Sequence, residues 1–179
     1  MNRAVLALSL VAGALVIAQA GLPATDVSAA YPRCRTKQLH LTAGAYGEAA
    51  QQFIQTLTFT NESSRRCQLQ GWPAVTVRGR SGRLVVKTRR VVQGPPSARP
   101  YECVVLRALG AASFDVYGAD WNALANRQCP KTSALVVTPP GASRTLEVRV
   151  RLPSCGVLLV APLVAGIRDG DAWSTVWKS

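Results

Sequence analysis

The residue types that most often carry chemistry are scarce in this chain of 179 residues, which has five cysteines and a single histidine, His40. No two cysteines form a C-x-x-C pair, and a zinc site needs four nitrogen or sulfur ligands at close spacing, so we predict no metal site. Because the number of cysteines is odd, two disulfides and one free thiol are the simplest arrangement, and the residues alone leave the pairing open. The cysteines are Cys34, Cys67, Cys103, Cys129 and Cys155.

Hydrolytic chemistry has equally little support. A serine nucleophile needs a base, but no G-x-S-x-G motif is present, and His40 alternates with Leu39 and Leu41 as a solvated strand residue would. We therefore predict that the protein is not an enzyme and that it has no catalytic residue and no cofactor. The alternative is a cell-wall hydrolase, or an inhibitor of an envelope enzyme, with two carboxylates facing each other across a cleft. We expect most of the eight carboxylates in 31–179 to be solvated. The alternative would gain support if Asp115, Asp120 or Glu147 lay within ~6 Å of another carboxylate in a cleft.

Positive charge is the strongest surface property of the sequence. The formal net charge is +12, and the stretch 63–101 contains basic residues but no acidic one. Guanidinium groups bind anions through paired hydrogen bonds, so this stretch predicts a patch that holds an anionic cell-wall polymer or a phospholipid surface. The alternative is a solubilising role that discourages pairing between strand edges. The candidate anion-binding residues are Arg65, Arg66, Arg78, Arg80, Arg83, Lys87, Arg89 and Arg90.

Sequence-specific binding of nucleic acid is not expected. No aromatic residue interleaves the cations between Arg78 and Arg99, and no recognition-helix motif is present. The sequence identifies no protein partner.

The first 30 residues have the pattern of a signal peptide. Arg3 precedes an apolar run, residues 4–18, which is shorter than the ~20 residues needed to span a bilayer. Small residues offer cleavage near Ala20 or near Ala30, and we favour Ala30. The alternative is an anchor that stays in place. We predict a protein that is secreted or held at the extracellular face of the cell envelope, where cysteines form disulfides.

The rest of the chain, 31–179, predicts a single all-β domain, because its apolar residues come in short runs separated by Gly, Pro and Ser. In the central stretch 57–73, a strand containing Leu57 and Phe59 leads through a polar turn to Cys67 and then to Trp72. We interpret Trp72 as a core residue; the alternative is an aromatic surface on which a ligand stacks. The cleanest alternation is 144–152. Further strands are expected at 38–41, 75–78, 84–88, 104–106, 113–117, 135–138 and 157–160.

Three other segments complete this interpretation. A short helical turn is expected at 120–126, with Asp120 as its cap and with Trp121 and Leu124, three apart, packing it onto a sheet edge. Residues 94–100 are a proline-rich crossover. The tail, 165–179, carries Trp173 and Trp177 and either closes the sheets or forms an exposed aromatic anchor. The predicted fold is an immunoglobulin-like antiparallel β-sandwich stapled by two disulfides.

Several blocks of residues resemble a known family. The most specific is L-T-F-T-N-E-S at 57–63 running into C-Q-L-Q-G-W-P-A-V at 67–75, and Cys34, Cys129, the run 135–141 and Cys155 extend it. In these blocks the chain resembles the actinobacterial secreted family called domain of unknown function 4232, over residues 34 to about 164. The resemblance implies a secreted or envelope-attached β-sandwich and implies no activity. Cys103 has no counterpart in the family pattern, and 106–110 departs from its L-x-P-G turn.

With this resemblance, we predict the bridges Cys34–Cys67 and Cys129–Cys155. They would close loops of about 33 and about 26 residues, each stabilising the fold by on the order of 3 kcal/mol. The first bridge would pin the start of the domain to the sheet. Cys103 would then be the free thiol, either buried or forming a dimer.

Overall fold

The described residues form an all-β structure, as the sequence predicts. The computed structural model describes residues 31–79, 81–85, 88–91 and 102–167. In this part of the chain the helical structure is one 3₁₀ turn, Thr36–Gln38, and no helix is long and apolar enough to cross a bilayer. The proline-rich segment 94–100 and the tail that carries Trp173 and Trp177 lie outside the described residues.

The larger sheet contains β1 (Leu39–Ala49), β2 (Gln52–Asn61), β6 (Thr88–Arg90), β8 (Ala111–Ala119), β13 (Leu158–Val160) and β14 (Val164–Ala165). Its order is β1-β2-β8-β13-β6, and β14 also pairs with β8. Its pairs are antiparallel except that β13 and β6 run parallel. The predicted antiparallel architecture therefore has one exception.

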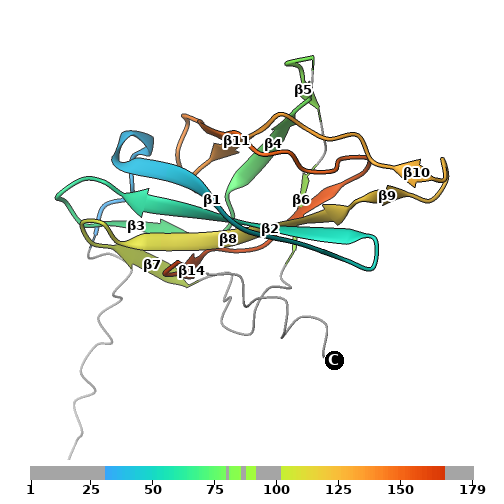
Figure 1. Cartoon of the computed structure of the whole chain (residues 1–179). Coiled ribbons are helices and arrows are strands. Elements are labelled where there is room, and N and C mark those ends of the chain that lie inside the picture. The colour runs from blue at the N-terminus through green and yellow to red at the C-terminus, as the bar shows by residue number, and fades with distance from the viewer. Residues whose placement is uncertain (1–30, 80, 86–87, 92–101, 168–179) are drawn as a thin grey trace, which may run out of the picture.

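A second sheet has the order β12-β11-β4-β5. Its strands are β4 (Ala74–Arg78), β5 (Leu84–Val85), β11 (Ala134–Thr138) and β12 (Leu146–Val148). Two smaller pairs join β3 (Cys67–Gln70) to β7 (Cys103–Leu106), and β9 (Trp121–Asn122) to β10 (Arg127–Gln128). Figure 1 shows β1, β2 and β8 running side by side along the molecule, with β4 and β11 crossing behind them.

One hydrophobic core joins these sheets. Alternate residues of a strand point to the same face, so Phe59 of β2 and Phe114 of β8 meet on the inner face, with ring centroids 5.4 Å apart. Val77 and Leu135 of the second sheet are fully buried in the same cluster, as is Leu106 of β7. Each such side chain stabilises the fold by about 2 kcal/mol.

The opposite face of β2 and β8 is also buried, which the sequence does not predict. Thr56, Thr58, Ser113 and Asp115 alternate with the core residues, and all four are nearly inaccessible to solvent. They bond across the strands, because the Thr56 hydroxyl donates to Asp115 Oδ1 at 2.7 Å, and Thr58 Oγ and Ser113 Oγ are 3.0 Å apart. Asp115 is thus an exception to the expectation that most carboxylates are solvated.

The predicted helical turn at 120–126 is wrong, because these residues lie in a β-hairpin formed by β9 and β10. The amide of Ala125 donates to the side chain of Asn122, and Asn126 has a φ of 46°, which closes a tight turn. Leu124, expected to pack on the sheet, is fully exposed. The helical spacing of Trp121 and Leu124 was therefore fortuitous.

The predicted strand 144–152 is shorter than expected. Only Leu146–Val148 pairs with β11. Beyond it, regular pairing is replaced by bonds to Thr132, whose amide donates to Leu152 O at 2.8 Å and whose hydroxyl accepts from the Leu152 amide at 3.0 Å. The alternation itself persists, since Leu146, Val148 and Val150 all pack against the core.

Both predicted disulfides are confirmed. Cys34 is bonded to Cys67, with Cα atoms 4.8 Å apart, and Cys129 to Cys155, with Cα atoms 5.1 Å apart. Cys103 is a free, half-buried cysteine. The first disulfide thus links the residues just before the 3₁₀ turn to β3, and the second links the residue just after β10 to the chain that precedes β13.

Candidate anion-binding site

A row of cations lies at the start of the described chain. In residues 33–37, Cys34 and Thr36 are buried, whereas Arg33, Arg35 and Lys37 are exposed. Two backbone hydrogen bonds beside the disulfide fix this segment to Gln68. The Cys34 amide donates to Gln68 O at 3.0 Å, and the Gln68 amide donates to Pro32 O at 2.9 Å. The alternation therefore points three cations outward from a covalently anchored backbone.

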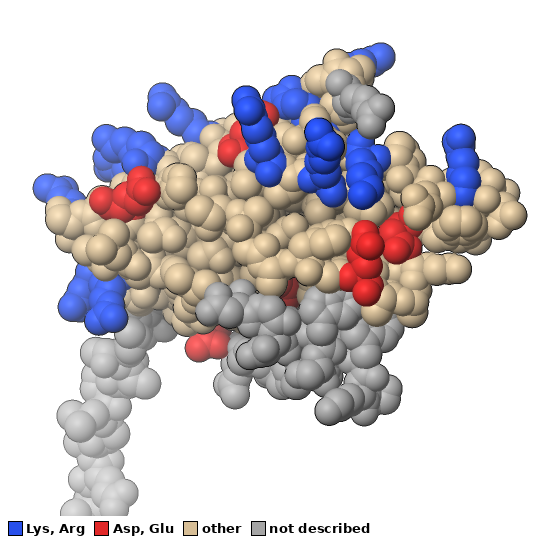
Figure 2. Space-filling view, viewed as in Figure 1, with Lys and Arg blue, Asp and Glu red and all other residues tan. Residues whose placement is uncertain are grey.

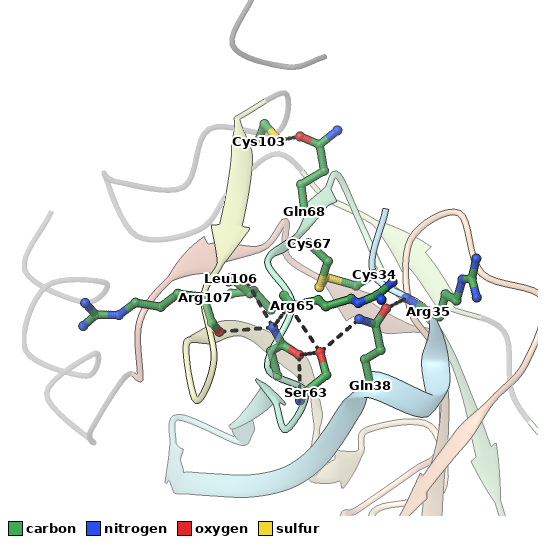
Figure 3. Close-up of a disulfide and its surroundings, with 11 residues drawn as sticks. Cys34, Arg35, Gln38, Ser63, Arg65, Cys67, Gln68, Cys103, Leu106 and Arg107 are labelled. Atoms are coloured by element: carbon green, nitrogen blue, oxygen red, sulfur yellow. Dashed lines mark hydrogen bonds between the residues drawn. A yellow bond between two sulfur atoms is a disulfide. The ribbon is translucent and has the colours of Figure 1, made fainter. Parts of the chain in front are cut away.

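A chain of hydrogen bonds holds this row against the β2–β3 turn. Gln38 Oε1 accepts from the Arg35 amide at 2.8 Å, and Gln38 Nε2 donates to Ser63 Oγ at 3.0 Å. Ser63 Oγ donates in turn to Asn61 Oδ1 at 2.7 Å, and Asn61 Nδ2 donates to Arg65 O at 2.8 Å. Figure 3 shows Arg65 reaching from this turn past Cys34 toward the segment that carries Arg35.

A first pocket of about 450 Å³ lies between residues 33–37 and the loop 141–144. The Thr36 hydroxyl donates to Arg144 O at 3.1 Å, which fixes the loop against the 3₁₀ turn. Gly141 has a φ of +72°, and a Cβ built there would come within 2.6 Å of Arg33 Nη1. Glycine thus allows both the turn and the close approach of the Arg33 side chain.

A second pocket of about 340 Å³ lies on the other side of the same segment. Its remaining wall is the β2–β3 turn, residues 63–66. Arg66 Nη1 donates to the Tyr31 hydroxyl at 3.1 Å, and its guanidinium lies 5.9 Å from the centre of the Tyr31 ring. Tyr31 therefore restricts the positions that Arg66 can take.

The two pockets are lined by cations without any carboxylate. Three cations line both pockets, Arg144 lines the first alone, and Arg65 and Arg66 line the second alone. We call these residues the basic site; they are Arg33, Arg35, Lys37, Arg65, Arg66 and Arg144. Figure 2 shows basic side chains at the end of the molecule where the described chain begins, and more along the side that carries β4 and β11.

The structure does not bring the sequence-predicted anion-binding residues into one patch. Arg65 and Arg66 lie in the basic site, at the left end of Figure 1, whereas the β4–β5 hairpin stands at the top. Arg78 is ion-paired with Glu147 at 3.1 Å and donates to Gly82 O at 2.7 Å. The remaining predicted cations are Arg83, Arg89 and Arg90, which are exposed, and Arg80 and Lys87, which lie outside the described residues.

Four cations of the basic site were missed by the sequence analysis. Arg33, Arg35 and Lys37 carry a readable signal, because they alternate with Cys34 and Thr36 as residues of an extended segment do. Arg144 carries no such signal. It reaches the site through a turn in which the Ala142 amide donates to Pro139 O at 3.0 Å.

The carboxylates considered for hydrolysis lie elsewhere. Asp115 is buried beneath the sheet surface, and Glu147 is paired with Arg78. Asp120 and Glu48 lie near Tyr46, whose hydroxyl donates to Glu48. Partial burial, the bond to Glu48 and the two negative charges together raise the pKa of Tyr46. None of these carboxylates lines a pocket of the basic site.

Comparison with known proteins places the whole arrangement in a family. No curated protein and no solved structure matches the chain. A family model described as "Domain of unknown function (DUF4232)" matches residues 34–163, which include both disulfides and the strands from β1 to β13. Because the match covers well over half of the sequence, the chain belongs to the DUF4232 family.

Proposed function

We propose that the protein is a non-enzymatic binding module of the actinobacterial cell envelope, with an immunoglobulin-like sandwich fold, and that it holds anionic envelope polymers or phospholipid headgroups through the basic site. The observation that carries this proposal is the pair of adjoining pockets whose lining contains six cations and no carboxylate. Unlike Arg78, these cations are not neutralised by an acidic residue of the pocket lining.

The physical basis is the sharing of one anion by several guanidinium groups. Each charge-assisted bond contributes about 1.5–3 kcal/mol where water is partly excluded. Arg35 and Arg65 stand on backbones fixed by the disulfide and by Gln38, so less conformational entropy is lost on binding. Binding by such a site falls steeply as salt rises, because exposed charges are screened.

The disulfides support the proposed location. Stable disulfides are typical of proteins in oxidising compartments outside the cytoplasm, and the N-terminal residues carry the signal-peptide pattern described above. We therefore propose that the protein is exported and acts where wall polymers and lipid headgroups are accessible.

The test is binding of the purified protein to anionic phospholipid vesicles and to isolated wall polymer at low and high salt. A basic-site variant, Arg33→Ser/Arg35→Ser/Arg65→Ser, should lose more than about tenfold in affinity. The charge-matched control is Arg83→Ser/Arg107→Ser/Arg127→Ser, which changes three exposed cations outside both pockets. Equal losses in the two variants would reject the basic site as the binding surface.

A further inference from the structure

A third basic pocket lies at the far end of the segment that begins at Arg144. It has a volume of about 390 Å³ and no carboxylate in its lining, which is Lys131, Thr132, Ser133, Arg149, Val150 and Arg151. The three cations are exposed. Thr132 joins the two segments that line this pocket, because its hydroxyl donates to Val150 O at 3.2 Å.

The segment 144–151 connects this third pocket to the basic site. Residues 145, 147, 149 and 151 are exposed, whereas Leu146, Val148 and Val150 pack on the core. An extended chain rises about 3.3 Å per residue, so Arg144 and Arg151 are up to about 23 Å apart. Glu147 is the one acidic residue in the segment, and Arg78 neutralises it at 3.1 Å. The path between the pockets is therefore free of uncompensated negative charge.

We infer that the basic site and the third pocket bind one linear, phosphate-bearing polymer, which lies along residues 144–151. This inference rests on the proposed function and specifies its ligand: a chain with repeated phosphate groups that reaches over about 20 Å. Arg144 lines the first pocket, and Arg149 and Arg151 line the third. Phosphate groups of the polymer would therefore contact cations at both ends of the path.

The arrangement of the cations, rather than their type, favours phosphate over carboxylate, because an arginine fork matches two oxygens of either anion. Arginine predominates in both places, and its planar fork of donors matches two oxygens of one anion. A tetrahedral phosphate presents oxygens in more than one plane, so it can accept bonds from opposite walls of a pocket, such as Arg35 and Arg144. Engagement of two pockets by one chain raises affinity beyond that of either pocket alone.

Inorganic polyphosphate of two lengths provides the probe. Tripolyphosphate fits one pocket, whereas a chain longer than about 23 Å reaches both. We expect the long chain to bind the wild-type protein at least about tenfold more tightly than tripolyphosphate does, measured by calorimetry at low salt. The third-pocket variant, Lys131→Ser/Arg149→Ser/Arg151→Ser, should lose most of this gain. The charge-matched control, Arg83→Ser/Arg107→Ser/Arg127→Ser, should keep it, since none of its residues lines the three pockets.

Each other outcome is decisive. If the third-pocket variant and the control bind the long chain equally well, the inference is wrong. The proposed function still stands in that case if the basic-site variant loses binding. Polyglutamate of similar length that binds as tightly as polyphosphate would reject the assignment to phosphate. If the wild-type protein binds neither polyphosphate, wall polymer nor vesicles at low salt, the proposed function fails together with the inference.

Discussion

Asn61 is the residue on which the β2–β3 turn depends. Its side chain is completely buried; Nδ2 donates to the carbonyls of Arg65, Leu106 and Arg107, and Oδ1 accepts from the amide of Ser63. The N-E-S tripeptide fits the glycosylation pattern, but an amide with no exposed surface serves the turn instead.

We expect Asn61→Ala to lower the free energy of unfolding by about 3 kcal/mol, because it leaves several buried carbonyl and amide groups without partners. Asn61→Asp should be at least as harmful, since a carboxylate would face three carbonyl oxygens. Denaturation in guanidinium chloride measures both. The control is Ser64→Ala at the exposed neighbour, expected to change stability by less than about 0.5 kcal/mol; a loss as large as that of the Asn61 variants would contradict this role.

Cys103 should react slowly with thiol reagents in the folded protein. Burial raises the pKa of its thiol, and Sγ donates to Gln68 Oε1 at 2.8 Å. The thiolate is the reactive form, so at a given pH less of it is present than in an unfolded chain, and the labelling rate should rise only at higher pH. The measurement is the rate of alkylation against pH, native and denatured. Denatured protein kept unreduced should show about one thiol per chain; none would mean that Cys103 is bridged between chains.

At the scale of elements, the contact of β8 with β2 and β13 leaves no room beside Gly118. A Cβ built there would lie 2.6 Å from both Leu158 Cδ2 and Phe53 Cε1. Both side chains are almost completely buried, so neither can move away freely. We expect Gly118→Ala to destabilise the protein by about 1–3 kcal/mol. Gly156→Ala is the matched control, because no atom lies within 4 Å of its Cβ. Thermal unfolding of the two variants should differ; equal melting temperatures would contradict the predicted crowding.

Strands with strong alternation could be predicted from the sequence, and those defined by distant partners could not. β4 and β8 have apolar residues at alternate positions and β11 is a short apolar run, and pairing with distant strands confirms all three. β3 has only four residues, two of them glutamine, and becomes a strand because β7 pairs with it across a large sequence separation. Burial of the threonine face of β2 was equally hidden, since an alternating Thr pattern is typical of a solvated face.

At the scale of the whole molecule, the two disulfides carry a large share of stability. Each is expected to contribute on the order of 3 kcal/mol, against total stabilities of about 5–15 kcal/mol for domains of this kind. We expect Cys34→Ala/Cys67→Ala to cost more than Cys129→Ala/Cys155→Ala, because both members of the first pair are fully buried in the core, whereas Cys155 is half-buried. Denaturation measures the free energy of unfolding that each double variant loses. A larger loss in Cys129→Ala/Cys155→Ala would contradict this expectation.

The two double variants also test whether a disulfide supports anion binding by the basic site in protein that remains folded. Loss of Cys34–Cys67 should release residues 33–37 and weaken anion binding, whereas loss of Cys129–Cys155 should leave binding intact in whatever protein remains folded. Binding to anionic vesicles below the unfolding temperature is the measurement. Equal binding by the two variants would show that the hydrogen bonds of Gln38, Thr36 and Gln68 hold the site together without the disulfide.

Charge density along the sequence was a poor guide to charge density in space. The stretch 63–101 is the most basic part of the chain, but those of its cations that the structure describes divide between the β2–β3 turn, the β4–β5 hairpin and the strand β6. Arg33 and Arg144, more than a hundred residues apart, line one pocket. The packing of Gly141 against Arg33 and the hydrogen bond from the Thr36 hydroxyl to Arg144 O bring them together.

The bridge between Cys34 and Cys67 also determines how the protein would bear tension. A polymer held by Arg33 and Arg35 pulls on residues directly beside Cys34, and that load passes through a covalent bond into β3, which is paired with β7. Without the bridge, the same load would fall on the hydrogen bonds of Pro32 and Cys34 to Gln68, which would peel open one after another. Under the proposed function, the disulfide would therefore keep this edge of the domain paired while a bound polymer is under tension.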